Sequence, residues 1–409
     1  MERVCIIGLG YIGLPTAAFL ANGGQQVVGV DINRERVELI NAGRAPFLEA
    51  GFGKLLSKVV SSGNLIASLE PTKSDVFILA VPTPFTEDRK VDATYIDAAV
   101  RAIAPILQPG NLVVLESTCS PGTTRHLAKL IYSLRPDLKE DCQIEFAHAP
   151  ERVLPGNIME EMVANDRIIG GLTPQAAERT KALYASFCHG EIRVTDAETA
   201  EMTKLAENAF RDVNIAFANE LSLICDKNGV NVWELIGLAN LHPRVNILSP
   251  GPGVGGHCIA VDPWFLIGAA PESTRLIQAA RRVNDSKPDF LVDKIAETIE
   301  NSLNDVVALF GLSFKANIED LRESPSLRVL DLFRQKFPFH KVLVVEPNIR
   351  ELPSRYRNDS YIELVQLEDA LMKADTLVFL VDHHEFLNIQ LDDIGHKTII
   401  DAKGIFSKE

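Results

Sequence analysis

Short apolar runs alternate with stretches of helical periodicity over the first third of the chain. The helical pattern is clear over residues 94–107 and 123–134. Apolar runs of about four to eight residues that alternate with helices are typical of a buried parallel sheet with helices on both faces. The predicted strands are residues 4–8, 26–31, 75–81, 112–116 and 144–148, and the runs 167–170 and 192–195 extend the same sheet.

The pattern changes near Asp196. Residues 196–227 contain no helix breaker, and Asn228-Gly229 then supplies a C-terminal stop. At the rise of an α-helix this element is about 45–50 Å long. A second helical stretch covers residues 273–302. Two such helices form a connector or a dimerisation element, or they pack within one subunit, and amphipathicity alone does not choose the partner.

The alternation of strands and helices resumes in the last third. The predicted strands are residues 306–310, 341–345, 376–381 and 398–401, and the predicted helices are 325–333 and 367–374. We therefore predict an α/β fold in which two Rossmann-like doubly wound domains are joined by a central helical region with a long helix. The predicted domains are residues 1–195, 196–302 and 303–409.

Composition excludes several classes of protein. The 409 residues carry 41 basic and 55 acidic side chains, a net charge of −14 that argues against a nucleic-acid partner. No apolar run approaches the ~18 residues of a membrane span, and the N-terminus lacks the features of a signal peptide. The six cysteines form no C-x-x-C pair, so we predict neither disulfides nor a metal site. These features favour a cytoplasmic protein in which a special cysteine is catalytic.

A glycine motif follows the first predicted strand and opens a helix. Its sequence is Gly8-Leu9-Gly10-Tyr11-Ile12-Gly13, and Asp31 ends the next strand 18 residues later. This spacing is typical of a dinucleotide site, where a pyrophosphate meets the helix N-terminus and the acid binds the ribose hydroxyls. A carboxylate at Asp31 repels a 2′-phosphate, so NAD is predicted. Arg34 and Arg36 keep NADP as an alternative.

Polar groups follow three further strands of the first domain. Thr83 and Thr118 each offer a hydroxyl at a strand end, where the ligand crevice of such sheets lies. Ser120-Pro121 reads as an N-cap with proline at the first helical position. Glu151-Arg152 follows the next strand and reads as a base with an anion clamp, or as a solvated loop.

Three polar side chains share one face of the long predicted helix. Lys204, Asn208 and Arg211 are spaced by four and three residues, so they point the same way. An ammonium, an amide and a guanidinium together suit a developing negative charge. The alternative is a solvated polar stripe.

Four glycines precede a single cysteine in the run from Pro250 to Cys258. Glycine permits a positive φ and lets a ligand approach the backbone closely. Asp262-Pro263 then begins a helix, and a thiol at such a junction can act as a nucleophilic thiolate. A buried inert cysteine is the alternative. In the last domain, Lys315 and Arg322 follow the first strand and are candidates for anion contacts.

These motifs together resemble the nucleotide-sugar 6-dehydrogenases, the UDP-glucose/GDP-mannose dehydrogenase family. The resemblance extends from G-L-G-Y-I-G-L-P to D-A-K-G and includes G-G-H-C-I-A-V-D and F-K-A-N-I-E-D-L-R-E-S-P. The stretches A-E-M-T-K-L-A-E-N-A-F-R-D-V-N-I-A-F-A-N-E-L and H-P-R-V-N-I-L-S-P-G-P-G-V-G-G-H-C look closest to the UDP-N-acetyl-D-mannosamine dehydrogenase branch. That branch makes UDP-N-acetyl-D-mannosaminuronic acid for bacterial surface polysaccharides.

The resemblance implies a fold and a reaction. It implies an N-terminal NAD domain, a central helical domain that forms a homodimer, and a C-terminal UDP-binding domain. It also implies a four-electron oxidation at C6 of a UDP-sugar, in which Cys258 holds the aldehyde as a thiohemiacetal and then as a thioester that water hydrolyses.

The resemblance also implies roles for individual residues. Cys258 is the nucleophile, Lys204 and Asn208 stabilise the oxyanion, Glu151 is the acid/base, and Thr118 and Asp262 hold water and the reacting groups. The cofactor set is Gly8, Gly10, Tyr11, Ile12, Gly13, Asp31, Arg36, Thr83, Thr118 and Arg322. The substrate set is Arg152, Val153, Lys204, Asn208, Arg211, His242, Arg244, Gly255, Phe314, Lys315 and Lys403, with Arg244 acting across the subunit interface.

Two positions depart from the family pattern. Many relatives have serine where this chain has Ala149, and many have proline where it has Ala260. Neither change removes a chemical role, although both bear on the choice of sugar. UDP-N-acetyl-D-glucosamine and UDP-glucose therefore stay as alternative substrates. A non-catalytic sensor of NAD or nucleotide sugars is the alternative from a different class.

Overall fold

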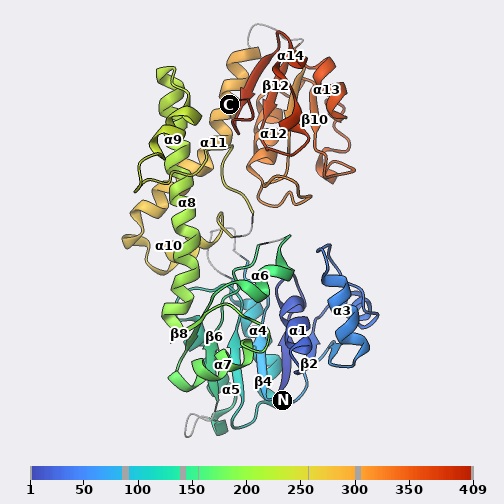
Figure 1. Ribbon diagram of the computed structural model, residues 1–409, viewed down its shortest axis with the longest axis vertical. Coiled ribbons are helices and arrows are strands. Elements are labelled where there is room, and N and C mark those ends of the chain that lie inside the picture. Colours follow the sequence, from blue (N-terminus) through green and yellow to red (C-terminus); the bar gives the residue numbers. More distant parts are fainter. Residues whose placement is uncertain are drawn as a thin grey trace. The chain divides into compact units, whose positions relative to one another are not determined.

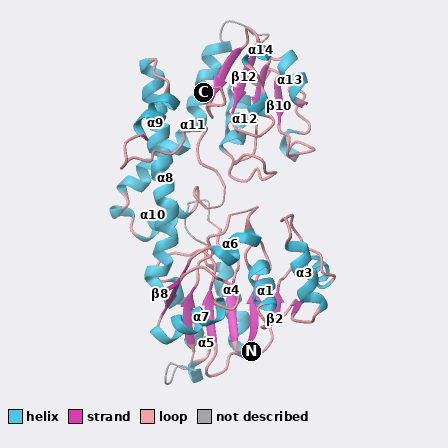
Figure 2. Cartoon of the chain, in the orientation of Figure 1, coloured by secondary structure: helices cyan, strands magenta, loops and turns pink. Residues whose placement is uncertain are grey.

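The computed structural model describes residues 2–84, 92–138, 144–154, 156–256, 258–299 and 305–406 (Figures 1 and 2). The chain divides into two units by its packing. The N-terminal unit is Met1–Ala206 with Trp264–Ala269, and the C-terminal unit is Glu207–Pro263 with Ala270–Glu409. The described strands form one sheet in each unit.

The sheet of the N-terminal unit has eight described strands in the order β3-β2-β1-β4-β5-β6-β7-β8. They are β1 (Arg3–Ile7), β2 (Gln26–Val30), β3 (Leu65–Ser68), β4 (Val76–Leu79), β5 (Leu112–Leu115), β6 (Glu145–His148), β7 (Arg167–Gly171) and β8 (Ile192–Asp196). The predicted strands are all present, and β3 is additional. Among the described strands of this sheet, only β6 and β7 pair antiparallel. The connection between β6 and β7 contains only the short helix α6 (Ile158–Ala164), which ends just before β7. It therefore lacks the crossover helix that usually joins two parallel strands.

Helices cover both faces of this sheet. The core on one face contains α1 (Gly13–Asn22), α2 (Arg34–Asn41), α3 (Phe52–Ser61), α6 and α7 (Pro174–Tyr184). The core on the other face contains α4 (Thr94–Ile103) and α5 (Thr123–Leu134). Strand residues alternate between the two cores: Val114 faces the first, while Val113 and Leu115 face the second.

The long helix is α8 (Ala197–Asn228), which has 32 residues and confirms the sequence prediction to within one residue at each end. It ends where Gly229 takes a φ of +64°, a left-handed conformation that glycine adopts at little cost.

The sheet of the C-terminal unit is parallel, with the order β11-β10-β9-β12-β13. Its strands are β9 (Val307–Phe310), β10 (Val342–Val345), β11 (Ile362–Leu364), β12 (Thr376–Phe379) and β13 (Thr398–Asp401). One face packs on α11 (Arg275–Ile299) and α12 (Pro325–Lys336), and the other on α13 (Leu367–Lys373) and α14 (Leu391–Ile394). This order repeats β3-β2-β1-β4-β5 of the first sheet, so the prediction of two Rossmann-like folds is confirmed.

Two shorter helices are also present in the described part of the chain, namely α9 (Val232–Ala239) and α10 (Asp262–Ala269). Single turns of 3₁₀ helix lie at Ala104–Ile106, Pro136–Leu138, Pro271–Ser273, Ser354–Tyr356 and Phe386–Asn388.

Candidate active site

The glycine motif forms the turn between β1 and α1. Gly8 has a φ of +98°, and a Cβ there would lie 2.5 Å from the carbonyl oxygen of Ala80. A Cβ at Gly13 would lie 2.0 Å from the carbonyl oxygen of Gly8, so both positions require glycine. No side chain caps the first turn of α1, so the positive end of its dipole lies at the glycine turn, while the amides of Leu14 and Thr16 donate to the carbonyls of Gly10 and Ile12. These features fit the pyrophosphate of a dinucleotide.

Asp31 follows β2 and is 7% exposed. Its Oδ2 accepts hydrogen bonds from the amide of Leu9 at 3.1 Å and from Nη1 of Arg36 at 2.9 Å. Its Oδ1 accepts the amide of Asn33 at 2.9 Å. The carboxylate therefore fixes the glycine loop and Arg36 at the place where a ribose binds in this fold, which fits NAD.

Tyr11 links the glycine loop to the loop after β6. Its hydroxyl donates to Oε2 of Glu49 at 2.6 Å and accepts the amide of Gly156 at 3.2 Å. The loop after β6 also holds Glu151, so the nucleotide loop and this loop are joined within the N-terminal unit.

Glu151 is buried, and its ionic partner is Arg167 on β7. Nη1 of Arg167 donates to Oε2 of Glu151 at 2.7 Å, and both side chains are about 5% exposed. Oε1 of Glu151 accepts the amides of Arg152 at 2.7 Å and Val153 at 3.2 Å. Arg152 instead donates from its guanidinium to the carbonyl of Asp166. The interpretation of Glu151-Arg152 as a solvated loop pair is therefore wrong for the carboxyl, which Arg167 holds inside the unit.

Arg167 was missed because the sequence shows it only as the first residue of an apolar strand. An arginine at that position offers no local signal of its partner, since Glu151 lies 16 residues earlier in the chain. The guanidinium also lies over the rings of Tyr184 and Phe187, with its carbon 5.3 Å from each ring centre. Aromatic faces stabilise a buried cation in this way.

Lys204 and Thr118 meet within the N-terminal unit. The ammonium of Lys204 on α8 donates to Oγ1 of Thr118, which follows β5. Thr83 lies half-buried in the loop after the neighbouring strand β4. The carboxyl ends of β4 and β5 are therefore followed by hydroxyl groups, and α8 brings the ammonium of Lys204 to Thr118. Such groups are expected in a crevice that binds a polar ligand.

Glu201, one turn before Lys204 on α8, caps α5. It accepts the amides of Gly122 at 2.5 Å and Thr124 at 2.7 Å, together with the hydroxyl of Thr124 at 2.7 Å. The prediction that Ser120-Pro121 caps this helix is wrong. Gly122 has a φ of +88°, and the helix begins at Thr123. The cap comes from a residue 77 to 79 positions away, which no local pattern reveals.

Cys119, His148 and Glu201 are buried, and their ligand atoms lie within 4.8 Å of one another. Burial raises the pKa of the Cys119 thiol well above its usual value and lowers the pKa of His148 to about 3. Both groups are therefore uncharged at neutral pH. Since the Glu201 oxygens already accept the donors of the helix cap, the arrangement fits a satisfied core better than a metal site.

The loop before α10 carries Cys258, which is exposed. Gly253 has a φ of +134° and Gly256 a φ of +82°. A Cβ at Gly255 would lie 2.5 Å from the carbonyl of Glu323 and 2.8 Å from Cβ of Phe314. The absence of a side chain at Gly255 lets the loop lie directly against Phe314. The predicted site residues Gly255 and Phe314 are therefore in contact. The alternative of a buried inert cysteine is therefore wrong.

Asn208 and Asp262 meet in the same unit. Nδ2 of Asn208 on α8 donates to Oδ2 of Asp262 at 2.6 Å. Asp262 begins α10, four residues after Cys258, and is 2% exposed. Its amide donates to the carbonyl of Cys258 at 2.7 Å. The cysteine backbone and the Asn208 amide are thus both tied to the first residue of α10.

A buried polar network between α8 and α11 holds the start of this loop. Oδ1 of Asn219 accepts the amide of Gly251 at 2.8 Å, and its Nδ2 donates to Asn284 at 2.9 Å. Asn284 donates to Oδ1 of Asp212 at 2.8 Å, and Arg281 donates to the same oxygen at 2.7 Å. These residues were missed, although Asp212 and Asn219 lie seven residues apart and so share the buried face of the helix.

The remaining predicted residues of the C-terminal unit lie at its surface or at strand ends. Arg211, His242, Arg244 and Lys315 are exposed. The guanidinium of Arg322 pairs with Asp320 at 2.6 Å, and Lys403 pairs with Asp382 at 3.2 Å. Arg322 and Lys403 therefore have carboxylate partners that an anionic ligand would have to replace.

The second sheet copies only part of the dinucleotide site. Gly311 has a φ of +91° and follows β9 as Gly8 follows β1. Glu346 follows β10, as Asp31 follows β2, and it accepts the amides of Leu312 at 2.7 Å and Ser313 at 3.0 Å. His383 contacts the same carboxylate at 3.1 Å, and both side chains are fully buried.

The predicted site residues divide between the two units. The N-terminal unit holds Gly8, Gly10, Tyr11, Ile12, Gly13, Asp31, Arg36, Thr83, Thr118, Glu151, Arg152, Val153 and Lys204. The C-terminal unit holds Asn208, Arg211, His242, Arg244, Gly255, Cys258, Asp262, Phe314, Lys315, Arg322 and Lys403.

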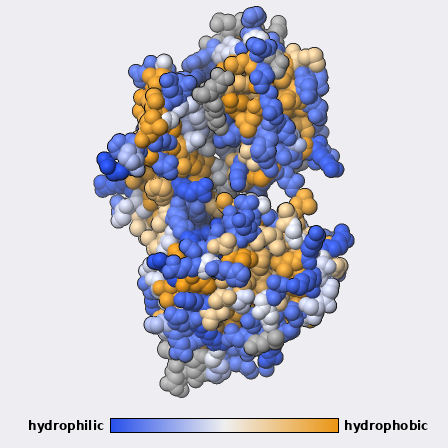
Figure 3. Space-filling model, viewed as in Figure 1, coloured by the Kyte–Doolittle hydropathy of each residue, from blue (hydrophilic) through white to orange (hydrophobic). Residues whose placement is uncertain are grey.

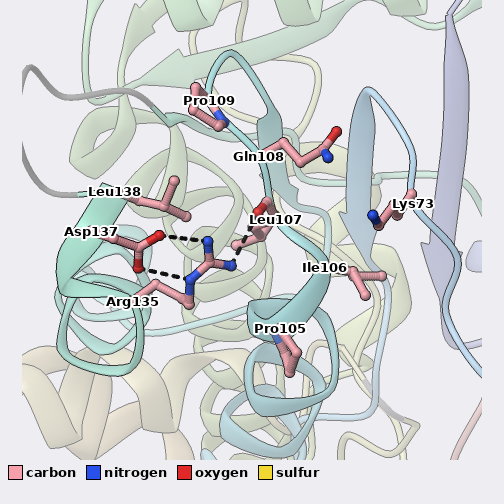
Figure 4. A pocket seen from close by; sticks show the side chains of 9 residues that line it. All are labelled: Lys73, Pro105, Ile106, Leu107, Gln108, Pro109, Arg135, Asp137 and Leu138. Carbon is pink, nitrogen blue, oxygen red and sulfur yellow. Dashed lines mark hydrogen bonds and ion pairs between the residues drawn. The ribbon is translucent and has the colours of Figure 1, made fainter.

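A pocket of about 360 Å³ lies elsewhere in the N-terminal unit, at the amino ends of β4 and β5 (Figure 4). Arg135 lines it, but its guanidinium is occupied by Asp137 at 2.7 Å and by the carbonyls of Ala104 and Leu107. Ligands of doubly wound sheets bind at the carboxyl ends of the strands, so this pocket is not the active site.

In the part of the chain that the structure describes, no helix is long and apolar enough to cross a membrane.

Comparisons with known proteins identify the family of the chain. Models of the UDP-glucose/GDP-mannose dehydrogenase family match the chain over residues 2–188 (NAD binding domain), 198–286 (central domain) and 308–408 (UDP binding domain). An NDP-N-acetyl-D-galactosaminuronic acid dehydrogenase of Ralstonia nicotianae is 53% identical, over 99% of this chain and 96% of the relative. A UDP-N-acetyl-D-mannosamine dehydrogenase of Escherichia coli is 49% identical, over 98% and 99%.

Solved structures give the same result. A UDP-D-ManNAc dehydrogenase from Pyrococcus horikoshii has a TM-score of 0.89 and 40% identity, covering 100% of this chain and 96% of its own. The UDP-N-acetyl-mannosamine dehydrogenase Cap5O of Staphylococcus aureus has a TM-score of 0.86 and 41% identity, with the same coverage. The chain therefore belongs to the UDP-glucose/GDP-mannose dehydrogenase family, and it is an NAD-dependent nucleotide-sugar dehydrogenase.

Proposed function

We propose that the chain oxidises UDP-N-acetyl-D-mannosamine at C6 to UDP-N-acetyl-D-mannosaminuronic acid, in a cytoplasmic pathway to bacterial surface polysaccharide. The observation that carries this proposal is an exposed cysteine in a glycine loop, with Asp262 and Asn208 tied to the same segment. The relatives named UDP-N-acetyl-D-mannosamine dehydrogenase support the choice of sugar.

The proposed reaction balances as one primary alcohol, two NAD⁺ and one water giving one carboxylate, two NADH and three protons. NAD supplies a hydride acceptor when it is bound. Cys258 adds its sulfur to the C6 aldehyde, and the resulting thiohemiacetal still carries a transferable hydrogen at C6. Its oxidation leaves a thioester, and attack by water breaks the C–S bond and returns the thiol.

Charged and polar groups of the chain would stabilise these steps. We assign Lys204 and Asn208 to the C6 oxygen, which gains negative charge in each tetrahedral state. Thr118 holds the ammonium of Lys204, and Asp262 holds the amide of Asn208 at 2.6 Å. Glu151 is assigned as the base for the attacking water, oriented by Arg167 at 2.7 Å.

The remaining assignments concern binding. The proposed cofactor residues are Gly8, Gly10, Tyr11, Ile12, Gly13, Asp31, Arg36, Thr83, Thr118 and Arg322. The proposed substrate residues are Arg152, Val153, Lys204, Asn208, Arg211, His242, Arg244, Gly255, Phe314, Lys315 and Lys403. The proposed functional domains are residues 1–195 for NAD, 196–302 for dimerisation and 303–409 for the UDP-sugar.

The surface of α8 supports the proposed homodimer. Phe210, Phe217 and Ile224 are 67%, 50% and 53% exposed and lie seven residues apart, so they form one apolar stripe. Leu238 on α9 is also exposed, and Figure 3 shows apolar surface (orange) over these helices. A stripe of large apolar side chains on a long helix is typical of a protein interface.

Phe217→Asp is expected to dissociate the homodimer. Each subunit would bury an unpaired carboxylate in the proposed interface, so the dissociation constant should rise by about a hundred-fold or more. Sedimentation velocity over a range of protein concentrations measures this change. Phe339→Asp is the matched control, because Phe339 is 79% exposed but lies outside the stripe. Equal dissociation in both variants, or in neither, would exclude the stripe as the interface.

Asp31→Asn is expected to weaken NAD binding and to reduce the preference for NAD over NADP. The amide keeps an oxygen for the amide of Leu9, but it removes the charge that favours the ribose hydroxyls and repels a 2′-phosphate. The KM for NAD should rise about ten-fold, as for the loss of one hydrogen bond to a charged group. Asp137→Asn, at the opposite edge of the sheet, should leave both KM values unchanged. An unaltered ratio of the two KM values in Asp31→Asn would remove Asp31 from the cofactor site.

A substrate panel tests the proposed function. NADH release would be measured with five substrates: UDP-N-acetyl-D-mannosamine, UDP-N-acetyl-D-glucosamine, UDP-N-acetyl-D-galactosamine, UDP-glucose and GDP-mannose. We expect two NADH per UDP-N-acetyl-D-mannosamine and the highest kcat/KM with that sugar. The galactosamine derivative is the second candidate, because of the relative with 53% identity. Binding of NAD and sugar nucleotides without NADH from any of them would indicate a sensor instead.

A further inference from the structure

The proposed reaction leaves one buried acid of the N-terminal unit without a role. Glu116 follows β5 and is 2% exposed. Its Oε1 accepts the hydroxyl of Thr16 on α1 at 3.0 Å and that of Tyr184 on α7 at 2.8 Å. Its Oε2 is buried and has no hydrogen-bond partner among the described residues. A buried carboxylate oxygen without a donor is costly, whereas a protonated one is much less so.

Strand register brings Glu116 beside Glu151. β5 and β6 are parallel neighbours, with Leu115 opposite His148, so Ala149 lies opposite Glu116. Side chains alternate along a strand, and Ala147 and Ala149 lie in the same core as Val114. Glu116 continues the row of Val114, and Glu151, in the loop after β6, pairs with Arg167, whose guanidinium lies over the ring of the same Tyr184 that binds Glu116. Both acids therefore belong to the face that α1 and α7 cover.

The guanidinium of Arg167 binds Glu151 and acts on Glu116 only through its charge. Arg167 donates to Glu151 at 2.7 Å and to the carbonyl of Met162 at 3.1 Å. It gives Glu116 no hydrogen bond within the described part of the unit. Burial raises the pKa of Glu116 to about 7, and repulsion from Glu151 acts in the same direction. The hydroxyls of Tyr184 and Thr16 and the charge of Arg167 oppose this shift without cancelling it.

The other groups that face Glu116 do not supply a competing charge. Burial raises the pKa of Tyr184 well above its usual value, so its phenol is neutral over the working range. Thr16 does not titrate. The charge of the cluster near neutral pH is therefore decided by Glu151, Arg167 and the proton on Glu116.

We propose that Glu116 is a positioning residue for Glu151, a protonated carboxyl that leaves Arg167 to Glu151 alone and whose ionisation adds a second negative charge beside the base. This inference rests on the proposed role of Glu151 in hydrolysis. Glu116 does not touch the substrate in this scheme and acts only through the charge and placement of Glu151. Through Thr16 and Tyr184, the same carboxyl also joins α1, the helix that follows the glycine motif, to α7.

The proposal predicts a step in the pH dependence of hydrolysis. Below pH 7, Glu116 is neutral and the cluster contains one ion pair. As pH rises through about 7, Glu116 loses its proton, and the added charge strengthens Glu151 as a proton acceptor. Decay of the acyl-enzyme should therefore accelerate through this range in the wild type.

Two measurements on the full-length protein test this. The first is carboxyl ¹³C NMR of glutamate-labelled protein without ligands, in which one carboxyl should titrate near pH 7. The second is the rate of acyl-enzyme decay in single turnovers between pH 5.5 and 8.5 (about three units centred on 7). Glu116→Gln keeps the size and acceptor oxygen of the side chain but cannot ionise. Glu178→Gln on α7 is the matched control, because Glu178 is exposed.

The expected result is that the NMR titration and the kinetic step are present in the wild type and in Glu178→Gln, and that both are lost in Glu116→Gln. The proposal is overturned if no glutamate of the wild type titrates above pH 6, or if the kinetic step persists in Glu116→Gln. The NMR arm needs no substrate and no turnover. Lack of activity on every sugar nucleotide would thus refute the proposed function. The NMR titration would still determine whether Glu116 is protonated.

Discussion

Cys258→Ser is expected to lower uronic acid formation by on the order of a thousand-fold or more. A serine hydroxyl is a far weaker nucleophile than a thiolate, and the ester it forms is hydrolysed more slowly than a thioester. Product analysis after incubation with NAD and UDP-N-acetyl-D-mannosamine measures the loss. Undiminished uronic acid from Cys258→Ser would exclude the thioester route.

The control for this variant is Cys225→Ala on α8. Cys225 is buried at 3% exposure in the same C-terminal unit, so its loss removes a thiol without touching the exposed loop. Its activity should stay within about two-fold of the wild type, since a single buried methyl-sized change costs mainly stability. A loss of activity equal to that of Cys258→Ser would point to a general sensitivity to cysteine replacement.

Arg281→Met is expected to lower the free energy of unfolding by about 3–5 kcal/mol. The substitution leaves Asp212 buried without its cation, while Asn284 remains as a donor at 2.8 Å. Burial already raises the pKa of Asp212, and loss of the Arg281 charge, which lowers that pKa, would raise it further. Urea denaturation followed by circular dichroism measures the loss as a shift of the midpoint at constant slope.

Arg193→Met is the matched control for this variant. Arg193 pairs with Glu191 at 3.1 Å, but both side chains are mostly exposed, so its removal should cost less than about 1 kcal/mol. The double variant Asp212→Asn with Arg281→Met should recover part of the lost stability, because it removes the unpaired charge. A loss below about 1 kcal/mol in Arg281→Met would show that the network does not stabilise the unit.

Sequence reasoning works best where local chemistry is decisive. The strand–glycine–helix motif predicted the turn at Gly8 and the carboxylate at Asp31. A close backbone approach requires glycine, and a strand end is recognised from a few adjacent residues, so both signals are local in the sequence. The 32-residue helix α8 was predicted for the same reason, since no breaker interrupts it before Gly229. The strands β3 and β11, each at one edge of its sheet, were missed, although other strands of four residues were predicted.

Long-range partners were beyond the reach of the sequence alone. Glu201 caps a helix more than 70 residues earlier, and Arg167 on β7 pairs with Glu151 in the loop after β6. Such pairs depend on which strand lies beside which, and β7 runs antiparallel to β6, where a parallel sheet was expected, although it runs parallel to β8. Glu116 could be seen only as the last residue of a strand, since its isolation from water comes from α1 and α7.

Glu346 occupies in the second sheet the position that Asp31 occupies in the first, but its surroundings differ. Both carboxylates accept amides of the loop that follows the first strand of their sheet, Leu9 in one case and Leu312 and Ser313 in the other. Asp31 pairs with Arg36, whereas the Glu346 side chain is fully buried and contacts His383 at 3.1 Å. The same strand order therefore gives its acid an arginine partner in the NAD binding domain and a histidine partner in the UDP binding domain, so an acid at this position does not by itself mark a site for NAD.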